Sequence, residues 1–313
     1  INAYLAPVLP ETEWAYESTG IRELQDSGLD GSGIHVCMVD TGIDDSHPDF
    51  ANLTLTGFRD FYEDEHDLVR DVGEDSHGTM MAGLLVADGK FRGAAPGVDL
   101  SVALALGPSG TSGQEDRVAQ AIRWCRITQK ADIVSLSLGS EPGDGMGIQS
   151  ETTLAVQEAL DAGIFVVAAA GNTGDDPDIF DVSVPANLPG VIAVGSSTRS
   201  GSVWSNSAGG SLTNPYGDGN RSYPDQKPEV TAPGVLLFST TTTLIEPPYA
   251  YSTGTSDSTV LVTGALALIL ELHGAALAGD DGVIDSDEMG IVKRALASSC
   301  DKTGIDGSPH DTR

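Results

Sequence analysis

Short apolar runs alternate with helical patterns along most of this chain, and this alternation constrains the fold more than any other feature. The runs are bounded by Gly, Asp or Pro, as buried strands are, and they occupy residues 35–39, 100–106, 133–138, 164–170 and 191–194. An i, i+3, i+4, i+7 apolar stripe runs from Val118 to Cys125, and residues 153–162 also have a helical pattern. The alternation predicts an α/β fold with three layers, a doubly wound, mostly parallel sheet with helices on both faces. In such a fold the functional crevice lies at the carboxyl ends of the strands.

The charge balance is strongly acidic and excludes one class of partner. The 313 residues include 46 Asp and Glu against 16 Lys and Arg, which gives a formal net charge of −30. This charge repels nucleic acid. Self-repulsion destabilises a compact acidic chain in dilute buffer, whereas a Debye length of about 3 Å in 1 M salt screens most of it. The composition therefore predicts a halophilic protein; the alternative is a merely acidic secreted protein.

Cysteines and apolar segments give weaker indications of the environment. Cys37, Cys125 and Cys300 are too few and too scattered for a disulfide framework, and the first two fall in segments that we expect to be core. The longest apolar run, residues 260–270, is well short of the roughly 20 residues that span a bilayer, so it predicts a buried helix and no membrane partner. The chain opens at Ile1 without a signal-peptide pattern, which fits proteolytic maturation.

Two polar residues stand where the predicted fold places functional side chains. Asp40 directly follows the apolar run 35–39 and begins the sequence DTGID, in which Gly42 permits a tight turn. His77 lies in DSHGTMMAGLL, where a polar loop gives way to an apolar helix. An Asp in this position is also a common loop or N-cap residue, so Asp40 alone is weak evidence. His77 is the candidate base, because this loop-to-helix setting is missing from the other histidines, at positions 35, 47, 66, 273 and 310.

Ser256 and Asn172 complete the candidate set. Ser256 lies between a Gly and Thr turn and a long apolar helix, where free backbone N–H groups and the helix dipole favour developing negative charge. Asn172 ends the sequence AAAGN, directly after a predicted strand, and its amide can donate to an oxyanion. Each has an ordinary alternative, a helix cap for Ser256 and a turn for Asn172. Taken together with an acid and a base, they indicate nucleophilic catalysis.

Seven motifs follow one another along the chain. They are DTGID, SHGTMMAG, SLSLGS, AAAGN, PANLPGVIAVGS, KPEVTAPG, and GTS followed by an apolar helix. In this order they resemble the landmarks of the subtilisin-like serine proteases, whose triad also runs Asp, His, Ser along the chain. The resemblance implies a subtilisin-like peptidase domain at residues 29–313, with residues 1–28 as an N-terminal extension packing on it. The C-terminus would be truncated or processed, because the Gly-rich segment that usually closes the family domain is missing.

The resemblance also implies roles for these residues. Asp40 would orient His77, His77 would take the hydroxyl proton of Ser256, and Ser256 would attack the scissile carbonyl to form an acyl-enzyme. Asn172 and the N–H of Ser256 would hold the oxyanion. An extended polypeptide would pair as a strand with two backbone segments, beside a pocket for one side chain. The implied substrate-binding positions are Ser112, Gly113, Ser137, Leu138, Gly139, Ala169, Ala170 and Gly171.

The chain departs from the family directly after the nucleophile. The family continues GTS with Met, Ala, Ser and Pro, whereas this chain has Asp257, Ser258, Thr259 and Val260. An aspartate in the first turn of a helix suits the helix dipole, yet a second carboxylate facing Ser256 would disfavour the oxyanion. We therefore expect Asp257 to point into solvent. The alternative to an active endopeptidase is a catalytically impaired subtilisin-fold interaction protein.

No metal site is assigned from the sequence, and the implied chemistry requires no cofactor. The calcium loop that many family members carry is missing from LLVADGKFRGAAPG, and the acidic runs DDSHPD and EDEHD are expected to be solvated surface. Asp49 matches one calcium ligand of the family without its partners, so a structural calcium ion is left open. The sequence GDDGVIDSDE resembles half of an EF-hand loop, but Leu277 and Gly279 occupy earlier ligand positions. Asp285 and Glu288 are expected to form a capping box instead.

The sequence thus predicts a secreted enzyme matured from a precursor and working in brine. Its expected partners are polypeptide substrates and its own propeptide. A metal-dependent hydrolase is the third alternative, and it would need ligands at short fixed spacings that the chain does not supply.

Overall fold

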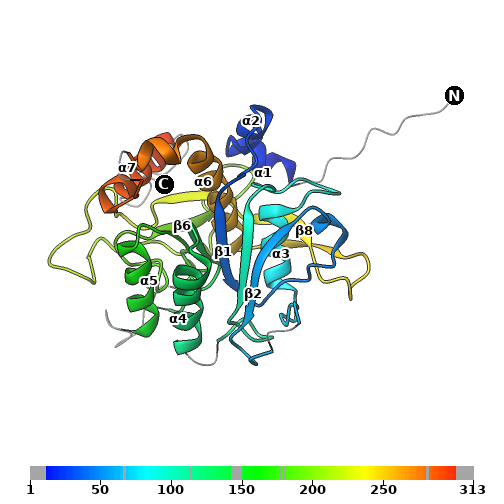
Figure 1. Ribbon diagram of the computed structural model, residues 1–313. Helices are drawn as coiled ribbons and strands as arrows, with labels where there is room; N and C mark the ends of the chain where they lie inside the picture. Colours follow the sequence, from blue (N-terminus) through cyan, green and yellow to red (C-terminus); the bar gives the residue numbers. More distant parts are fainter. Residues whose placement is uncertain are drawn as a thin grey trace.

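The computed structural model describes residues 12–65, 68–112, 115–141, 150–176, 178–179, 181–279 and 282–300. Its centre is a seven-stranded sheet with the order β2-β3-β1-β4-β5-β6-β7, in which all neighbours are parallel (Figure 1). The strands are β1 (His35–Asp40), β2 (Thr54–Asp60), β3 (Asp99–Leu104), β4 (Ile133–Leu136), β5 (Phe165–Ala169), β6 (Ile192–Ser197) and β7 (Val230–Pro233). An antiparallel pair, β8 (Val235–Thr240) and β9 (Tyr249–Thr253), lies apart from this sheet.

All five predicted strands are confirmed, and the two that the sequence patterns missed lie at the edges of the sheet. β2 carries exposed or partly exposed residues along most of its length, so it has no apolar run. β7 has four residues and ends in proline, which an edge strand tolerates. The strand order turns around between β1 and β4, and the ends of these central strands define the crevice of a doubly wound sheet.

Helices cover both faces of the sheet, as predicted. On one face, α4 (Glu115–Trp124) and α5 (Glu151–Asp161) lie side by side; on the other are α3 (His77–Val86) and α6 (Thr255–Leu277) (Figure 1). By length and composition α6 is the one described helix that passes a test for a membrane span. Its contacts with β4, β5, β6 and β7 instead make it the core helix of the sheet. A methyl group on Gly264 would lie 2.3 Å from Ala94 Cβ, so glycine is what allows this close packing.

The chain termini of the described region are tied to this core. α1 (Glu13–Ser18) and α2 (Ile21–Asp26) pack beside α3 and α6, where the Tyr16 hydroxyl donates to Leu84 O at 3.1 Å. At the other end, α7 (Ser286–Ser299) begins with the predicted capping box. Asp285 accepts from the backbone of Glu288, and the Glu288 side chain accepts from Asp285 N at 2.9 Å. The cap prediction is therefore confirmed.

One disulfide crosses the layers of the fold. Cys37 on β1 is bonded to Cys125, directly after α4, across a sequence separation of 88 residues. The cysteine spacing predicted no disulfide framework and did not reveal this bond, because the two residues meet only when α4 packs on the sheet. Cys300 takes no part in it.

Candidate active site

Asp40 and His77 meet at the carboxyl end of β1. Asp40 is the last residue of that strand and is 1% exposed, whereas His77 is the first residue of α3. A methyl group on Gly78 would lie 2.1 Å from Gly42 O, so the start of α3 rests directly on the turn that follows β1. This contact brings His77 Nδ1 to 2.7 Å from Asp40 Oδ1. The ring is thereby oriented with its Nε2 edge away from the carboxylate.

The charge of Asp40 changes the proton affinity of His77. Burial lowers the pKa of His77, but the neighbouring charges outweigh it and raise that pKa to about 9, with Asp40 the largest of them and Asp257 and Asp75 adding to it. About a quarter of the His77 side chain is exposed (26%), which leaves the ring open to a reacting group on one side. This is the environment of a proton acceptor whose protonated form is stabilised by a fixed anion.

Ser256 is the second residue of α6 and lies against the chain that follows β4. Its Oγ donates to Ser137 O at 3.2 Å, and the Ser137 hydroxyl donates to Ser256 O at the same distance. The structure contains no hydrogen bond between the described side chains of Ser256 and His77. Hydrogen bonds between a nucleophile and its base are often long or absent before substrate binds.

Asn172 is held by Thr255, a residue that sequence analysis did not single out. Its Oδ1 accepts from both the N–H and the hydroxyl of Thr255 at 3.0 Å. With the oxygen fixed in this way, the Nδ2 group is left to donate. A methyl group on Gly254 would lie 3.4 Å from Asn172 Nδ2 and 3.6 Å from Ser256 N, so both predicted oxyanion donors converge on one small space.

The predicted substrate segments enclose a further residue, Ser183. A methyl group on Gly139 would lie 2.7 Å from Ser183 Cβ, and one on Gly171 would lie 2.2 Å from Ser183 Oγ. Ser183 is buried between the two segments, and no local motif marks it. Ser137 is also buried, and Ala169 and Ala170 belong to the core beside it.

On the opposite side of the expected cleft, Ser112 O accepts from Arg117 Nη1 at 2.6 Å, so this backbone acceptor already has one donor. Gly113 lies outside the described residues.

The expectation that Asp257 points into solvent is wrong. Its side chain is 1% exposed, and Oδ2 accepts from the Ser252 hydroxyl of β9 at 3.0 Å. The first turn of α6 is covered on this side by β9, which sequence patterns do not reveal. Burial raises the pKa of Asp257 to about 7.

Comparison with known proteins decides the family. The sequence model of the subtilase family matches residues 31–310. The chain belongs to the subtilase family. This subtilase is 36% identical over 256 residues to the major intracellular serine protease of Bacillus subtilis (strain 168), covering 79% of the chain and 71% of that protein. It is 34% identical to subtilisin E of the same organism, of which it covers 58%, and 34% identical to subtilisin of Bacillus pumilus, of which it covers 81%; each match covers 80% of this chain.

A solved structure agrees with the fold of the subtilase. The crystal structure of a cold adapted subtilisin-like serine proteinase superposes with a TM-score of 0.64, covering 86% of this chain and 83% of that one. At 24% sequence identity this likeness supports the subtilisin-like fold alone. Membership of the family makes the chain a peptide-bond hydrolase of the serine protease type.

The acidic run after Asp40 in this subtilase is not simply solvated surface. His47 and Asp49 are buried, contrary to the expectation, because they support β9: the Tyr249 hydroxyl donates to Asp49 Oδ1 at 3.0 Å. Lys90 N donates to the same oxygen at 3.0 Å. Among the described residues there is no group of three or more His, Cys, Asp and Glu side chains placed to hold a metal ion. The second run, EDEHD, lies partly outside them.

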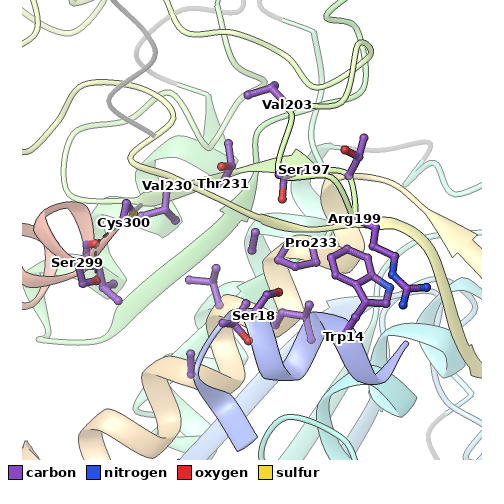
Figure 2. Close-up of a pocket in the computed structure, with 18 residues that line it drawn as sticks. Trp14, Ser18, Ser197, Arg199, Val203, Val230, Thr231, Pro233, Ser299 and Cys300 are labelled. Atoms are coloured by element: carbon purple, nitrogen blue, oxygen red, sulfur yellow. Dashed lines mark hydrogen bonds between the residues drawn. The ribbon is translucent and has the colours of Figure 1, made fainter. Parts of the chain in front are cut away.

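A cavity of about 400 Å³ lies elsewhere in the subtilase, between α1, the ends of β6 and β7, and α7 (Figure 2). Trp14 and Arg199 line one side of it, and Ser299 and Cys300 line the other (Figure 2). None of Asp40, His77, Asn172 and Ser256 borders it. The cavity is therefore separate from the candidate active site.

Proposed function

We propose that this subtilase is an active serine endopeptidase that cleaves extended polypeptides through an acyl-enzyme intermediate. The observation that carries the proposal is the 2.7 Å contact between His77 Nδ1 and Asp40 Oδ1 at the carboxyl edge of the sheet, with Ser256 at the start of α6, the helix that packs against α3. A base held by a buried carboxylate next to a helix-terminal serine is the arrangement that nucleophilic acyl transfer requires.

The proposed reaction uses these residues in two steps. Ser256 Oγ attacks the scissile carbonyl carbon while His77 Nε2 takes the hydroxyl proton, and the oxyanion is held by Asn172 Nδ2 and Ser256 N. The C–N bond then breaks, and His77 returns the proton to the leaving amine. Water attacks the acyl ester with His77 again as base, which releases the acid and restores Ser256.

The substrate would bind as an extended strand between the two predicted segments. Ser137–Gly139 would supply one edge and the chain at Ser112 and Gly113 the other. Ala169–Gly171 would form one wall of the side-chain pocket, and Ser183 would lie at its base because it fills the space between Gly139 and Gly171. Backbone pairing of this kind favours unfolded or flexible polypeptides. No metal or other cofactor takes part in the proposed chemistry.

Secretion into a saline medium and maturation from a precursor are part of the proposal. The net charge of −30 supports the saline medium, and the Cys37–Cys125 disulfide supports an oxidising compartment. The relatives include a protease named as intracellular, so compartment is a separate question from chemistry. Isolation of the protein from inside cells with Cys37 and Cys125 reduced would contradict secretion. If the protein expressed without any precursor segment folds and is active, maturation from a propeptide is contradicted.

Labelling with a serine-directed fluorophosphonate in molar salt tests the chemistry. We expect one label per molecule, located at Ser256 by peptide mapping and lost in Ser256→Ala. Ser258→Ala is the matched control, since this neighbouring serine donates to Ala232 O in the core and should leave labelling in place. Folded protein that takes no label at any pH would favour the interaction protein, with the replaced segment after Ser256 as the reason.

A further inference from the structure

A buried carboxyl group without a cationic partner lies beside the nucleophile. Asp257 is in the first turn of α6 and is 1% exposed. Ser252 donates to its Oδ2 at 3.0 Å, while Oδ1 is buried with no hydrogen-bond partner among the described residues. No described Lys or Arg forms an ion pair with it, so the hydrogen bond from Ser252 offsets only part of the cost of burying its charge.

This carboxyl group lies close to the proposed oxyanion donors. The point where a methyl group on Gly254 would lie is 3.5 Å from Asp257 Oδ2, 3.4 Å from Asn172 Nδ2 and 3.6 Å from Ser256 N. One small space is thus bordered by two donors and one carboxylate oxygen. A negative charge on Asp257 opposes the charge that develops on the substrate oxygen.

Few other titratable groups face Asp257. His77 of α3 is the cation within electrostatic reach, and Tyr16 of α1 lies near enough for its pKa to be raised in part by Asp257. β9 contributes the hydroxyl of Ser252, while its Tyr249 is bonded to Asp49 and its Tyr251 is exposed. Strands β4 to β7, which pack on α6, carry no titratable side chain.

Arg22 and Glu13, near this face in α2 and α1, are paired with each other. Of the cationic groups in this region, His77 is therefore the one that acts on the charge of Asp257, and Asp257 in turn adds to the effect of Asp40 on His77.

The coupling acts against the base. Burial raises the pKa of Asp257 to about 7, below the value of about 9 to which Asp40 and its neighbours raise that of His77. As the pH rises, Asp257 loses its proton while His77 still holds its own. The resulting anion stabilises the imidazolium, so a higher pH is needed before His77 can accept a proton from Ser256.

We propose that Asp257 is a positioning residue that restrains the triad near neutral pH: its buried carboxylate, placed beside the oxyanion donors at the start of α6, keeps His77 protonated and moves activity to alkaline pH. The inference rests on the proposed endopeptidase function. On this proposal, the aspartate that follows Ser256 in place of the family's methionine regulates the proteolytic activity and does not abolish it.

Asp257→Asn tests this, because it keeps the shape and the Ser252 contact and removes the charge. We expect the acid limb of the fluorophosphonate labelling rate to move about one pH unit lower, which is about tenfold faster labelling below the limb. Asp75→Asn is the matched control: Asp75 also acts on His77 but is exposed. Its smaller shift should vanish in 2 M NaCl, whereas that of Asp257→Asn should persist, since buried charges are screened less.

The possible results separate the two proposals. Labelling at Ser256 with the same acid limb in folded Asp257→Asn and wild type overturns the inference and keeps the protease. An absence of labelling in wild type and variants at every pH overturns the proposed function itself. If Asp257→Asn fails to fold, Ser252→Ala serves instead: it removes the donor that stabilises the Asp257 anion, so the acid limb should again move lower, and an unchanged limb contradicts the proposal.

Discussion

At the scale of single residues, Thr255 fixes the orientation of Asn172, the proposed oxyanion donor. Its N–H and hydroxyl both donate to Asn172 Oδ1, and its Oγ1 also accepts from Gly171 N at 3.1 Å. The amide of Asn172 is therefore unable to turn over without losing two hydrogen bonds. Fixing a donor before the reaction removes a reorganisation cost from the transition state, which is where such a donor contributes most.

Replacing this hydroxyl should lower turnover more than substrate binding. In Thr255→Val we expect kcat to fall by about 10- to 100-fold with little change in KM, because Asn172 keeps one of its two anchors and the loss is confined to oxyanion stabilisation. Peptide hydrolysis kinetics at saturating substrate measure this. Thr263→Val, two turns further along α6, is the control and should keep wild-type kcat. A change in KM alone would contradict the role given to Thr255.

At the level of elements, α7 is joined to the sheet by buried charges. Lys293 of α7 pairs with Glu229 at 2.9 Å, and Glu229 also pairs with Lys227 at 2.8 Å. All three side chains are nearly inaccessible, and Glu229 Oε2 accepts from Ala193 N of β6 at 2.8 Å. Burial lowers the pKa of Lys227 to about 8. The Glu229 carboxylate thus forms ion pairs with two lysines, and Lys293 forms a further ion pair with Asp225.

Neutralising that carboxylate should destabilise the whole domain. Glu229→Gln leaves buried lysines with less compensating charge, and we expect the free energy of unfolding to fall by about 3 to 5 kcal/mol in urea titrations. Glu158→Gln is the matched control, because Glu158 of α5 pairs with Arg123 and Arg126 at the surface and should cost less than about 1 kcal/mol. If the free energy of unfolding falls equally in the two variants, the buried cluster contributes no more to stability than a surface ion pair.

For the whole molecule, the excess of acidic residues decides how the fold responds to salt. The chain combines a formal net charge of −30 with one continuous hydrophobic core. Repulsion between surface carboxylates opposes the compact state, and it is screened when the Debye length falls to about 3 Å in 1 M salt.

We expect the thermal unfolding midpoint to rise by several degrees between 0.1 and 2 M NaCl and to rise equally in KCl, because screening does not distinguish these cations. Differential scanning fluorimetry of Ser256→Ala measures this, because removal of the proposed nucleophile should prevent autolysis. An unfolding midpoint that does not change between 0.1 and 2 M NaCl would contradict the prediction and indicate an acidic protein whose stability is independent of salt.

The sequence by itself determined the parts of this protein that depend on neighbours along the chain. Apolar runs marked the buried central strands, loop-to-helix transitions marked the starts of α3 and α6, and an Asp–Glu pair three residues apart marked the cap of α7. The four candidate catalytic residues were found in the same way, because each lies at the end of a strand or the start of a helix. These signals are local, since they follow from backbone periodicity and from unpaired backbone groups at element ends.

The tertiary structure decided what depends on contacts between distant segments. β9 buries Asp257, so a residue that was expected at the surface lies beside the predicted oxyanion donors. The packing of α4 on β1 brings Cys37 and Cys125 together. The packing of α6 against β5 allows Thr255 to donate hydrogen bonds to Asn172. A polar side chain has the same local pattern whether a strand covers it or water does. Its burial, its partners and its charge state are therefore fixed only when the layers of the fold come together.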